Sequence, residues 1–572
     1  MFKNMFKNND ISNNKHLLFN QQIKINNVKT INTKDGQMLL ISDLEGCAEF
    51  TPSGVPQSTI ECQEIFFNSI NIFLSSNLNN KVAFLGDYFD KGPFALESIT
   101  NIVKLHKDFK ERVIIILGNR DINKLRIPYE IQELNINYSK NSDKYRWAEW
   151  IKSGLYDKIS KEKEITEKII TILSTSMGAI PALRKKDEKE NKNSYNKFVK
   201  QQTYNYFRHN KSLVKDLFTI NKIKNSNIKE INFNENIIYL FSNSKIVHYD
   251  EDFEVLLSHA GGLAPELLEI NIDSFIYNLQ KLLISNPTLD YYQKIEIIRK
   301  DGLQIKNLIA IVNKDTNKEV YKNFYNKNNK SMTNKVKFTT LIDKINLLLT
   351  SFIKHISTHN GTTKFNFNIE QIPPEYFILQ AMGLKSDNSD YKFLSFIDSC
   401  DNTGCSGPNV DMDDEYYNYL KKLSLIGVKI IAHGHKPHCT PVPLIYKRNQ
   451  SDIVFIDNDV SNGYRPKNIN EVNKVPLSYI SKNNEKLLVG VGFINEKSNI
   501  KSPNTNSISK LPESIKKFSF MLREWNISTN NGLNKIPLLD KKEVTYSKIN
   551  YVDDKQELFF KKGFNPTDTK LF

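Results

Sequence analysis

Long hydrophobic runs are lacking from this sequence. No segment has the roughly 18 consecutive apolar residues that a membrane-spanning helix requires. The N-terminal sequence MFKNMFKNNDISNNKHLLFN contains no continuous apolar stretch of the kind found in secretory signals. Cysteine is also scarce, since five cysteines among 572 residues do not make a disulfide framework and favour a reducing compartment. We therefore expect a soluble, cytoplasmic protein that has no membrane partner.

Dense clusters of arginine are lacking too, although the chain is basic overall. The formal net charge is +15, but the basic residues are mostly lysines scattered among asparagine and isoleucine. Nucleic-acid-binding domains typically carry a basic stripe or aromatic residues interleaved with basic ones, and neither pattern occurs. We attribute the charge to a solvated, lysine-rich surface and do not expect nucleic acid to be a partner. The absence of the pattern G-x-x-x-x-G-K-[ST] also argues against a P-loop nucleoside triphosphatase.

What the sequence does contain is a series of apolar runs that end in polar turns. Three such runs follow a polar segment, residues 1–36, that we predict to be a flexible arm: QMLLISDLEG (37–46), KVAFLGDYFDKGP (81–93) and RVIIILGNRD (112–121). Residues 61–76 and 95–109 lie between them and have helical spacing. Strands that alternate with helices through short links predict a parallel sheet, so we expect the polar turns to line up along one edge.

Further strands are predicted in the second half of the chain. They are EVLLSHAGGL (254–263), VKIIAHGHKP (428–437), DIVFIDNDV (452–460) and KLLVGVGFI (486–494). The predicted α/β domain spans 37–500, with its core in 37–128, 252–265 and 425–495. Two charged segments, 129–240 and 266–390, are predicted to be large helical insertions. Residues 501–572 are predicted to be a C-terminal extension.

The predicted strand ends carry side chains that suit a divalent metal. Carboxylates, an asparagine carbonyl and imidazoles are ligands of Mn, Fe, Zn or Mg. Two such metals that share a carboxylate can activate a water molecule and stabilise a phosphoryl displacement. One Asp after a strand is more often a helix cap than a ligand, but five polar strand ends in this order are hard to obtain by chance. The groups are Asp43 with Glu45, Asp87 with Asp90, Asn119 with Arg120 and Asp121, His259, and His433 with His435.

The order SDLEG, GDYFDKG, GNRD, SHAGG and GHKP resembles the calcineurin-like metallophosphoesterase superfamily. The blocks of that family read D-x-H, G-D-x-x-D-R-G, G-N-H-E, a strand-end His followed by Gly-Gly, and G-H-x-H or G-H-T-P. HAGGL (259–263) leans toward the phosphoprotein phosphatase-like branch. The resemblance covers less than half of the chain, namely the predicted sheet. It implies a sandwich of two mixed sheets flanked by helices.

The resemblance also implies a role for each matching residue. Asp43 would bind a first metal together with Glu45, and Asp87 would bridge both metals. Asn119, His259 and His435 would bind the second metal. We expect two divalent ions, with Mn favoured over Fe, Zn or Mg.

The sequence H-G-H allows two assignments of these imidazoles. If it corresponds to the H-x-H form, His433 serves the second metal and His435 the first. If G-H-K-P corresponds to G-H-T-P, only His435 is a ligand, and we prefer this assignment because Gly434 directly precedes His435. In that case His433 is an imidazole packed beneath the site.

Two departures from the family concern charge near the metals. Glu45 stands where the family has His; a carboxylate can replace imidazole, but it favours a harder metal such as Mn or Mg. The alternative is that Glu45 points to solvent. Lys91 stands where the family has Arg, and it can attract one phosphate oxygen but cannot hold two as a guanidinium does. The alternative is that Lys91 is an ordinary surface lysine. Arg126 is our candidate for binding substrate phosphate, and its alternative is likewise a surface charge.

The third departure is Arg120, which replaces the family's proton-donating His. A guanidinium cannot donate a proton usefully at neutral pH, but Arg120 can pair with Asp90 and stabilise charge on the transferred group. Loss of a general acid costs roughly 10²–10⁴-fold in rate, and the loss matters most for poor leaving groups. Because a phenol is far more acidic than an alkyl hydroxyl, we expect a bias toward aryl phosphoesters, unless His433 or His438 supplies the proton.

Other candidates have weaker support. His355 and His359 have helical metal-ligand spacing but no acidic partner nearby, and Cys400 with Cys405 lacks the second pair that a zinc site needs. Asp457 and Asp459 follow a strand and could support the metal site.

Together these features favour a metal-dependent phosphoesterase that hydrolyses phosphomonoesters. A phosphoprotein is favoured as substrate over a small phosphoester because of the HAGGL sequence. One alternative is a nucleotide or dinucleoside polyphosphate hydrolase, in which G-H-x-P blocks also occur. Another is a catalytically degenerate binding module, and the features that favour it are Glu45 and Arg120.

Overall fold

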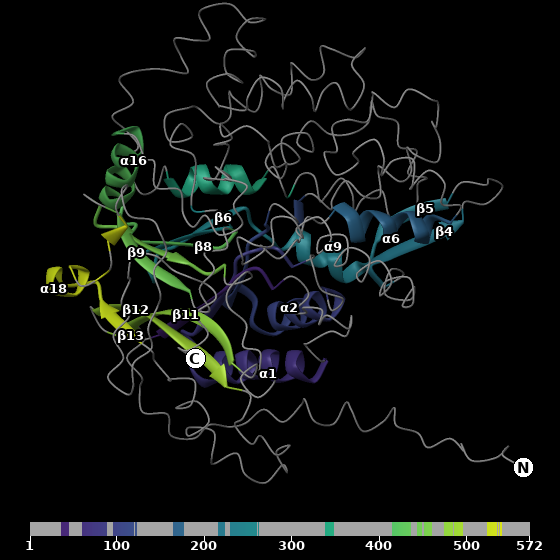
Figure 1. Cartoon of the computed structure of the whole chain (residues 1–572), viewed down its shortest axis with the longest axis horizontal. Coiled ribbons are helices and arrows are strands. Elements are labelled where there is room, and N and C mark those ends of the chain that lie inside the picture. The colour runs from purple at the N-terminus through teal and green to yellow at the C-terminus, as the bar shows by residue number, and fades with distance from the viewer. Residues whose placement is uncertain are drawn as a thin grey trace, which may run out of the picture.

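The computed structural model describes part of the chain. The described residues are 36–44, 60–88, 95–118, 121–122, 164–176, 216–222, 229–259, 261, 338–347, 350, 414–435, 443–448, 451–459, 474–483, 486–495, 523–534, 536 and 538–539. Within them the protein has mixed α/β structure with two six-stranded mixed sheets and a separate two-stranded hairpin (Figure 1).

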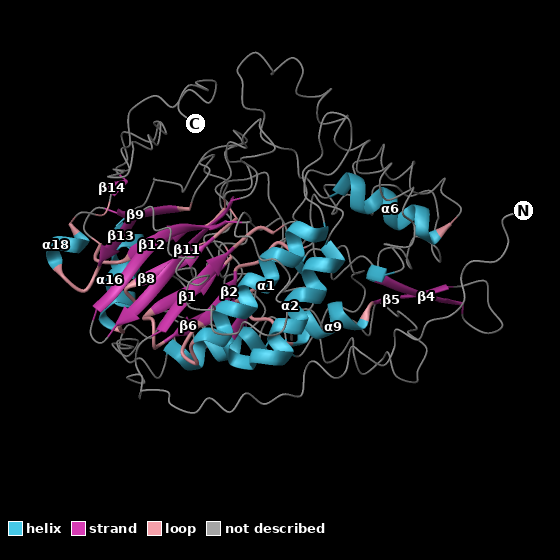
Figure 2. Ribbon diagram, turned by 90° about the horizontal axis from the view of Figure 1, so that it is seen from below, coloured by secondary structure: helices cyan, strands magenta, loops and turns pink. Residues whose placement is uncertain are grey.

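The first sheet has the strand order β13-β12-β11-β1-β2-β3. Its parallel strands are β1 (Gly36–Ile41), β2 (Lys81–Phe84) and β3 (Val113–Ile115). They are connected by α1 (Ile60–Ser76) and α2 (Ala95–Phe109), as the spacing of apolar residues predicted. The antiparallel strands β11 (Lys474–Asn483), β12 (Lys486–Asn495) and β13 (Arg523–Asn526) extend the sheet beside β1 (Figure 2).

The second sheet has the strand order β14-β9-β10-β8-β7-β6. Its parallel strands are β7 (Val255–Ser258), β8 (Ile430–His433) and β10 (Val454–Asp457). The antiparallel strands β6 (Val247–Asp250) and β9 (Leu444–Arg448) flank them, and β14 (Leu538–Leu539) pairs with β9. The helix α16 (Asp414–Leu425) precedes β8.

The apolar core lies where alternate residues of the two sheets meet. Met38, Leu40 and Ala83 of the first sheet belong to one buried cluster with Leu257 and Ala432 of the second. Successive side chains on a strand point to opposite faces, so the residues between them face outward. Burial of each large aliphatic side chain contributes about 1.5–3 kcal/mol, and this cluster is therefore the main attraction between the sheets.

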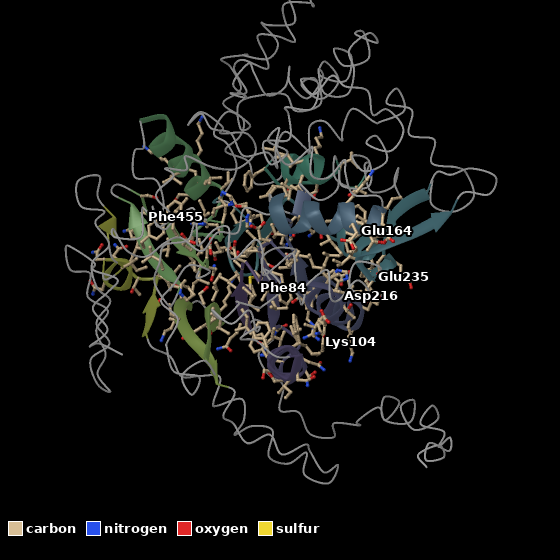
Figure 3. The ribbon with its side chains drawn as sticks, turned by 45° about the vertical axis from the view of Figure 1, so that its right-hand side comes forward. Phe84, Lys104, Glu164, Asp216, Glu235 and Phe455 are labelled. Carbon is tan, nitrogen blue, oxygen red and sulfur yellow. The ribbon has the colours of Figure 1, made fainter. Side chains whose placement is uncertain are left out.

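Aromatic residues cover the outer faces of both sheets. Phe84 of β2 contacts Phe67 of α1 with ring centroids 6.3 Å apart. Phe455 of β10 stacks on Tyr446 of β9 at 5.2 Å and 14°. Figure 3 labels Phe84 and Phe455, which lie in different sheets. Each sheet is thus packed on its outer face as well as its inner face.

Taken together, the described parts of the two predicted helical insertions contain strands as well as helices. Segment 129–240 contains α6 (Ile165–Ser176) and the start of α9 (Glu235–Ser242), but also the hairpin of β4 (Phe218–Lys222) and β5 (Lys229–Phe233). In segment 266–390, residues 338–347 are helical. Strands β13 and β14 lie beyond residue 500, so sheet structure continues into the segment that the sequence assigned to an extension.

None of the described helices is both long and apolar enough to cross a membrane.

Candidate metal centre

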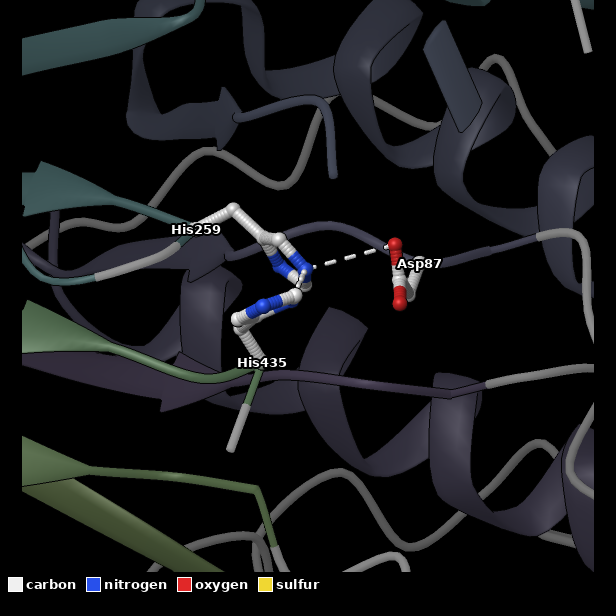
Figure 4. Close-up of side chains that lie close together, drawn as sticks. All are labelled: Asp87, His259 and His435. Atoms are coloured by element: carbon white, nitrogen blue, oxygen red, sulfur yellow. Dashed lines mark hydrogen bonds and ion pairs between the residues drawn. The ribbon is translucent and has the colours of Figure 1, made fainter. Parts of the chain in front are cut away.

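The carboxyl ends of strands from both sheets meet around a cluster of ionisable side chains. Asp87 follows β2, His259 follows β7, and His435 comes two residues after β8. One potential ligand atom from each of the three lies within 4.8 Å of the others. Figure 4 shows the two imidazoles beside each other and the carboxylate facing His259. Parallel strands present their carboxyl ends on the same side of a sheet, and here two sheets contribute to one site.

His259 is the central residue of this cluster. Its Nδ1 lies 2.6 Å from the Leu85 carbonyl oxygen, and because a carbonyl can only accept, Nδ1 carries the hydrogen. Its Nε2 lies 3.3 Å from Asp87 Oδ1 and 3.2 Å from His435 Nδ1. A backbone carbonyl that fixes the tautomer in this way is the usual support of a metal-binding imidazole.

The charge around His259 is strongly negative. Burial disfavours the imidazolium, but the charge and hydrogen bond of Asp87, the charge of Asp43 and the Leu85 carbonyl outweigh it, and the pKa of His259 rises to about 10. Asp87 and His259 are only 1% and 4% exposed. A buried site in which carboxylates overcome the cost of burying a positive charge is suited to hold a cation.

The donor atoms fit a transition metal in both chemistry and spacing. Two imidazole nitrogens and a carboxylate oxygen are ligands that Mn, Fe and Zn accept. Ligand atoms about 2.1 Å from one ion lie about 3.0–3.4 Å apart in octahedral or tetrahedral arrangements. The separations of 3.2 and 3.3 Å at His259 Nε2 fall in that range. Asp87, His259 and His435 therefore fit one divalent ion.

The backbone at these strand ends adopts an uncommon conformation. Asp43, Asp87 and His435 have positive φ angles of 52°, 57° and 73°. Lys110 and Glu254 are the other non-glycine residues with positive φ in the described part of the chain. A non-glycine residue in this region costs about 1–3 kcal/mol and persists only where its surroundings impose it. The concentration of such residues at this cluster indicates that the site is built at the expense of stability.

Two glycines allow these strand ends to come close together. A Cβ at Gly434 would overlap Ser42 Oγ and Asp43 Oδ2, and a Cβ at Gly118 would overlap Asp87 Oδ1. A side chain at position 434 would push the end of β8 away from Asp43. A side chain at position 118 would push the end of β3 away from Asp87. The close approach of these strand ends explains why glycine occupies both positions, in GHKP and in GNRD, and the sequence alone did not reveal this reason.

Asp43 lies beside the cluster, where it connects the two sheets. Its Oδ2 accepts hydrogen bonds from the Ser42 hydroxyl at 2.6 Å and from the backbone N–H of His435 at 3.1 Å. The carboxylate also contributes to the raised pKa of His259. The sequence suggested no role for Ser42, and the only available signal was its place directly before Asp43.

Asp121 organises the backbone of two strand ends. Its Oδ2 accepts from the N–H groups of Asp87 at 2.7 Å and Gly118 at 2.9 Å, and its Oδ1 accepts from the N–H of Tyr88 at 2.8 Å. Asp121 is fully buried, and these three N–H donors offset the cost of removing its carboxylate from water. The sequence placed Asp121 at a strand end but did not predict this role, which depends on the turn geometry.

His433 makes its contacts on the other face of β8. Ile430 and Ala432 face the core between the sheets, so strand alternation turns His433 outward. Its Nε2 lies 3.4 Å from the Tyr446 hydroxyl and its Nδ1 lies 3.8 Å from Asp457 Oδ1. This placement favours the alternative in which His435 is the ligand and His433 packs beneath the site. Asp457, the last residue of β10, pairs with His433 across the sheet, and Asp459 lies two residues beyond it; both carboxylates are buried.

Several residues that the sequence singled out lie outside the described residues. The metal-ligand candidates among them are Glu45 and Asn119. The candidates for phosphate or charge stabilisation are Asp90, Lys91, Arg120 and Arg126, and the minor candidates are His355, His359, Cys400 and Cys405.

Comparisons with known proteins returned no match: no family model, no curated protein and no solved structure matched this chain.

Proposed function

We propose that this chain is a metal-dependent phosphoesterase that hydrolyses phosphomonoesters, with a phosphoprotein as the favoured substrate. The observation that carries the proposal is the convergence of Asp87, His259 and His435 from three strand ends in two sheets. Strained backbone at two of these ligands and at Asp43 adds support. The preference for a phosphoprotein derives from the resemblance of HAGGL to the phosphoprotein phosphatase-like branch.

In this proposal Asp87, His259 and His435 hold the metal, with Asp43 beside them. These residues would hold a divalent ion, which would supply positive charge for phosphoryl oxygens and lower the pKa of a water molecule toward neutrality. Asp87 has two carboxylate oxygens and can bridge two ions. His259 would offer Nε2 to the ion, because the Leu85 carbonyl accepts the hydrogen of Nδ1. The positive charges of Arg120 and Lys91 would stabilise negative charge on the phosphoryl oxygens.

A screen for metal-dependent phosphatase activity tests this proposal. The purified chain is assayed with added Mn²⁺ on aryl phosphates, phosphopeptides and a dinucleoside polyphosphate, and its metal content is measured. We expect hydrolysis of phosphomonoesters that chelator abolishes and Mn²⁺ restores. Asp87→Asn should remove activity, whereas Asp252→Asn, an exposed carboxylate of the β6–β7 turn, should not.

Two other results would change the functional assignment. Preference for the dinucleoside polyphosphate would favour the nucleotide hydrolase. Less than one ion per chain together with no turnover in Mn²⁺ would favour the degenerate binding module that Glu45 and Arg120 suggest.

A further inference from the structure

A buried hydrogen bond joins the two sheets behind the metal centre. The hydroxyl of Ser478 donates to Asn458 Oδ1 over 2.6 Å. Ser478 lies on β11 of the first sheet, on the same face as the core residue Ile480, and Asn458 follows β10 of the second sheet. Ser478 is fully buried and Asn458 is 3% exposed. The pair is therefore a polar bridge at the margin of an apolar core.

The other end of the Asn458 amide holds the end of β8. Its Nδ2 donates to the carbonyl oxygen of His433 at 3.1 Å, and its backbone N–H donates to the same oxygen at 2.8 Å. The carbonyl can only accept, so the amide nitrogen must face His433 and the amide oxygen must face Ser478. In that orientation the Ser478 hydroxyl satisfies the amide oxygen of Asn458 and anchors the side chain that holds His433.

From this carbonyl the backbone leads directly to His435. The N–H of Gly434 donates to the His259 carbonyl at 2.8 Å, and the N–H of His435 donates to Asp43 Oδ2 at 3.1 Å. His435 then adopts its positive φ of 73°. Such a conformation persists only when neighbouring contacts over-determine it, and the contacts that flank it are these backbone hydrogen bonds and the double acceptor at His433.

The stability of the sandwich does not by itself require a polar pair here. Two apolar side chains of similar shape would avoid desolvation of a hydroxyl and an amide and are often equally stable. What the polar pair adds is direction, because hydrogen bonds constrain the end of β8 in a way that apolar packing does not.

We propose that Asn458 and Ser478 are positioning residues that hold the end of β8 so that His435 Nδ1 meets His259 Nε2, and that they thereby set the affinity of the centre for its metal. This inference rests on the proposed metal-dependent function. Ser478 and Asn458 act on the proposed ligand His435 through the His433 carbonyl and the end of β8.

The test compares the full chain with Ser478→Ala, which removes the hydroxyl and leaves the rest of the strand intact. Mn²⁺ affinity is measured by calorimetry, and amide hydrogen exchange of residues 430–435 is measured without metal. We expect Mn²⁺ to bind about 10–100-fold more weakly and the amides of Gly434 and His435 to exchange about 5–10-fold faster.

Ser451→Ala is the matched control. Ser451 is also buried and its Oγ accepts a hydrogen bond from the N–H of Ile453 at 3.0 Å, but it lies before β10, at the opposite end of that strand. A merely structural role for Ser478 would make both variants less stable and leave Mn²⁺ affinity unchanged in both. If Ser478→Ala does not fold, Asn458→Asp is measured in the same way, because it has nearly the same shape and lacks the donor to His433.

The outcomes separate this inference from the proposed function. Weaker Mn²⁺ binding and faster exchange in Ser478→Ala alone support it. Wild-type affinity in a folded Ser478→Ala or Asn458→Asp overturns the positioning role and leaves the phosphoesterase proposal intact. A wild-type chain that binds no Mn²⁺ overturns both.

Discussion

The backbone N–H of His435 donates to Asp43 Oδ2 over 3.1 Å, although the two residues are 392 positions apart in the chain. Asp43 lies two residues beyond β1 of the first sheet, and His435 lies two residues beyond β8 of the second. The hydrogen bond therefore joins the two sheets at the candidate metal centre. Changes that separate these strand ends should affect metal binding more than they affect folding.

Gly434→Ala tests the close approach of these strand ends. A Cβ at Gly434 would overlap Ser42 Oγ and Asp43 Oδ2, and relief of the overlap would move His435 away from Asp43. We expect the free energy of unfolding to fall by about 1–3 kcal/mol and Mn²⁺ affinity to fall at least about tenfold, as measured by urea denaturation and calorimetry.

Gly36→Ala is the control for that experiment. A Cβ there would lie 2.6 Å from the Asn79 carbonyl oxygen, at the opposite end of β1 from Asp43. It should destabilise the chain by a similar amount without a change in metal affinity. Equal losses of affinity in both variants would show that the effect is one of general stability.

Arg120→His tests how the leaving group is stabilised. If Arg120 replaces a general acid, the wild-type chain should favour aryl over alkyl phosphates in kcat/KM. Introduction of His should raise kcat/KM for alkyl phosphates by about 10²-fold or more and change aryl phosphates less. Equal kcat/KM on both classes in the wild type would remove the argument. Arg126→His is the companion variant, for which we expect no such selective gain.

His248 should make the protein sensitive to acid. Burial and the nearby charges of Lys245 and Lys81 lower the pKa of His248 to about 3, and Lys245 Nζ lies 3.1 Å from its Nδ1. Between pH 6.5 and 3 the unfolded chain binds a proton at His248 that the folded chain excludes. Stability is therefore full above pH 6.5 and falls toward pH 3, by up to about 1.4 kcal/mol per pH unit.

Replacement of this residue isolates its contribution. Urea denaturation of the wild type and His248→Gln is compared at pH 7.5, 5.5 and 4.5. The variant should lose less stability on acidification, because glutamine takes up no proton. Parallel curves for the two proteins would mean that His248 is protonated in the folded chain.

Lys81 joins the two sheets at the end opposite the candidate metal centre. Its Nζ, on β2, lies 2.7 Å from Asp250 Oδ2 and 2.8 Å from Asp252 Oδ2. Burial alone would lower the pKa of Lys81, but the two carboxylates raise it above its usual value. The stabilisation is therefore present below about pH 10.5 and is lost as the pH rises through the higher pKa of the folded state.

We expect Lys81→Met to reduce the free energy of unfolding by about 1–3 kcal/mol at pH 7.5, because Asp250 is left buried without its cation. Lys429→Met is the matched comparison: Lys429 lies 2.7 Å from Glu254 but is 48% exposed, and such a pair contributes about 0–1 kcal/mol. A smaller loss in the free energy of unfolding for Lys81→Met than for Lys429→Met would contradict the stabilising role given to Lys81. Differential scanning calorimetry and urea denaturation both measure the difference.

The strands that could be predicted from the sequence are those with a continuous apolar run. β1, β2, β3, β7, β8, β10 and β12 are of this kind, and their positions are confirmed. β9 and β11 were missed because they have short or mixed patterns, such as KVPLSYISKN, and become strands through pairing with neighbours. The hairpin β4–β5 was hidden within a charged segment that has helical composition.

By itself the sequence determined the strands with continuous apolar runs and the chemical types of the side chains at their ends, because both depend on neighbouring residues. It did not determine which side chains meet. His433 and His435 are two positions apart, and a regular strand would put them on one face. The tertiary structure decided otherwise: β8 ends at His433, which faces Tyr446, and the positive φ of His435 redirects the next imidazole toward His259. That conformation is held by contacts with Asp43 and Asn458, which no local pattern encodes.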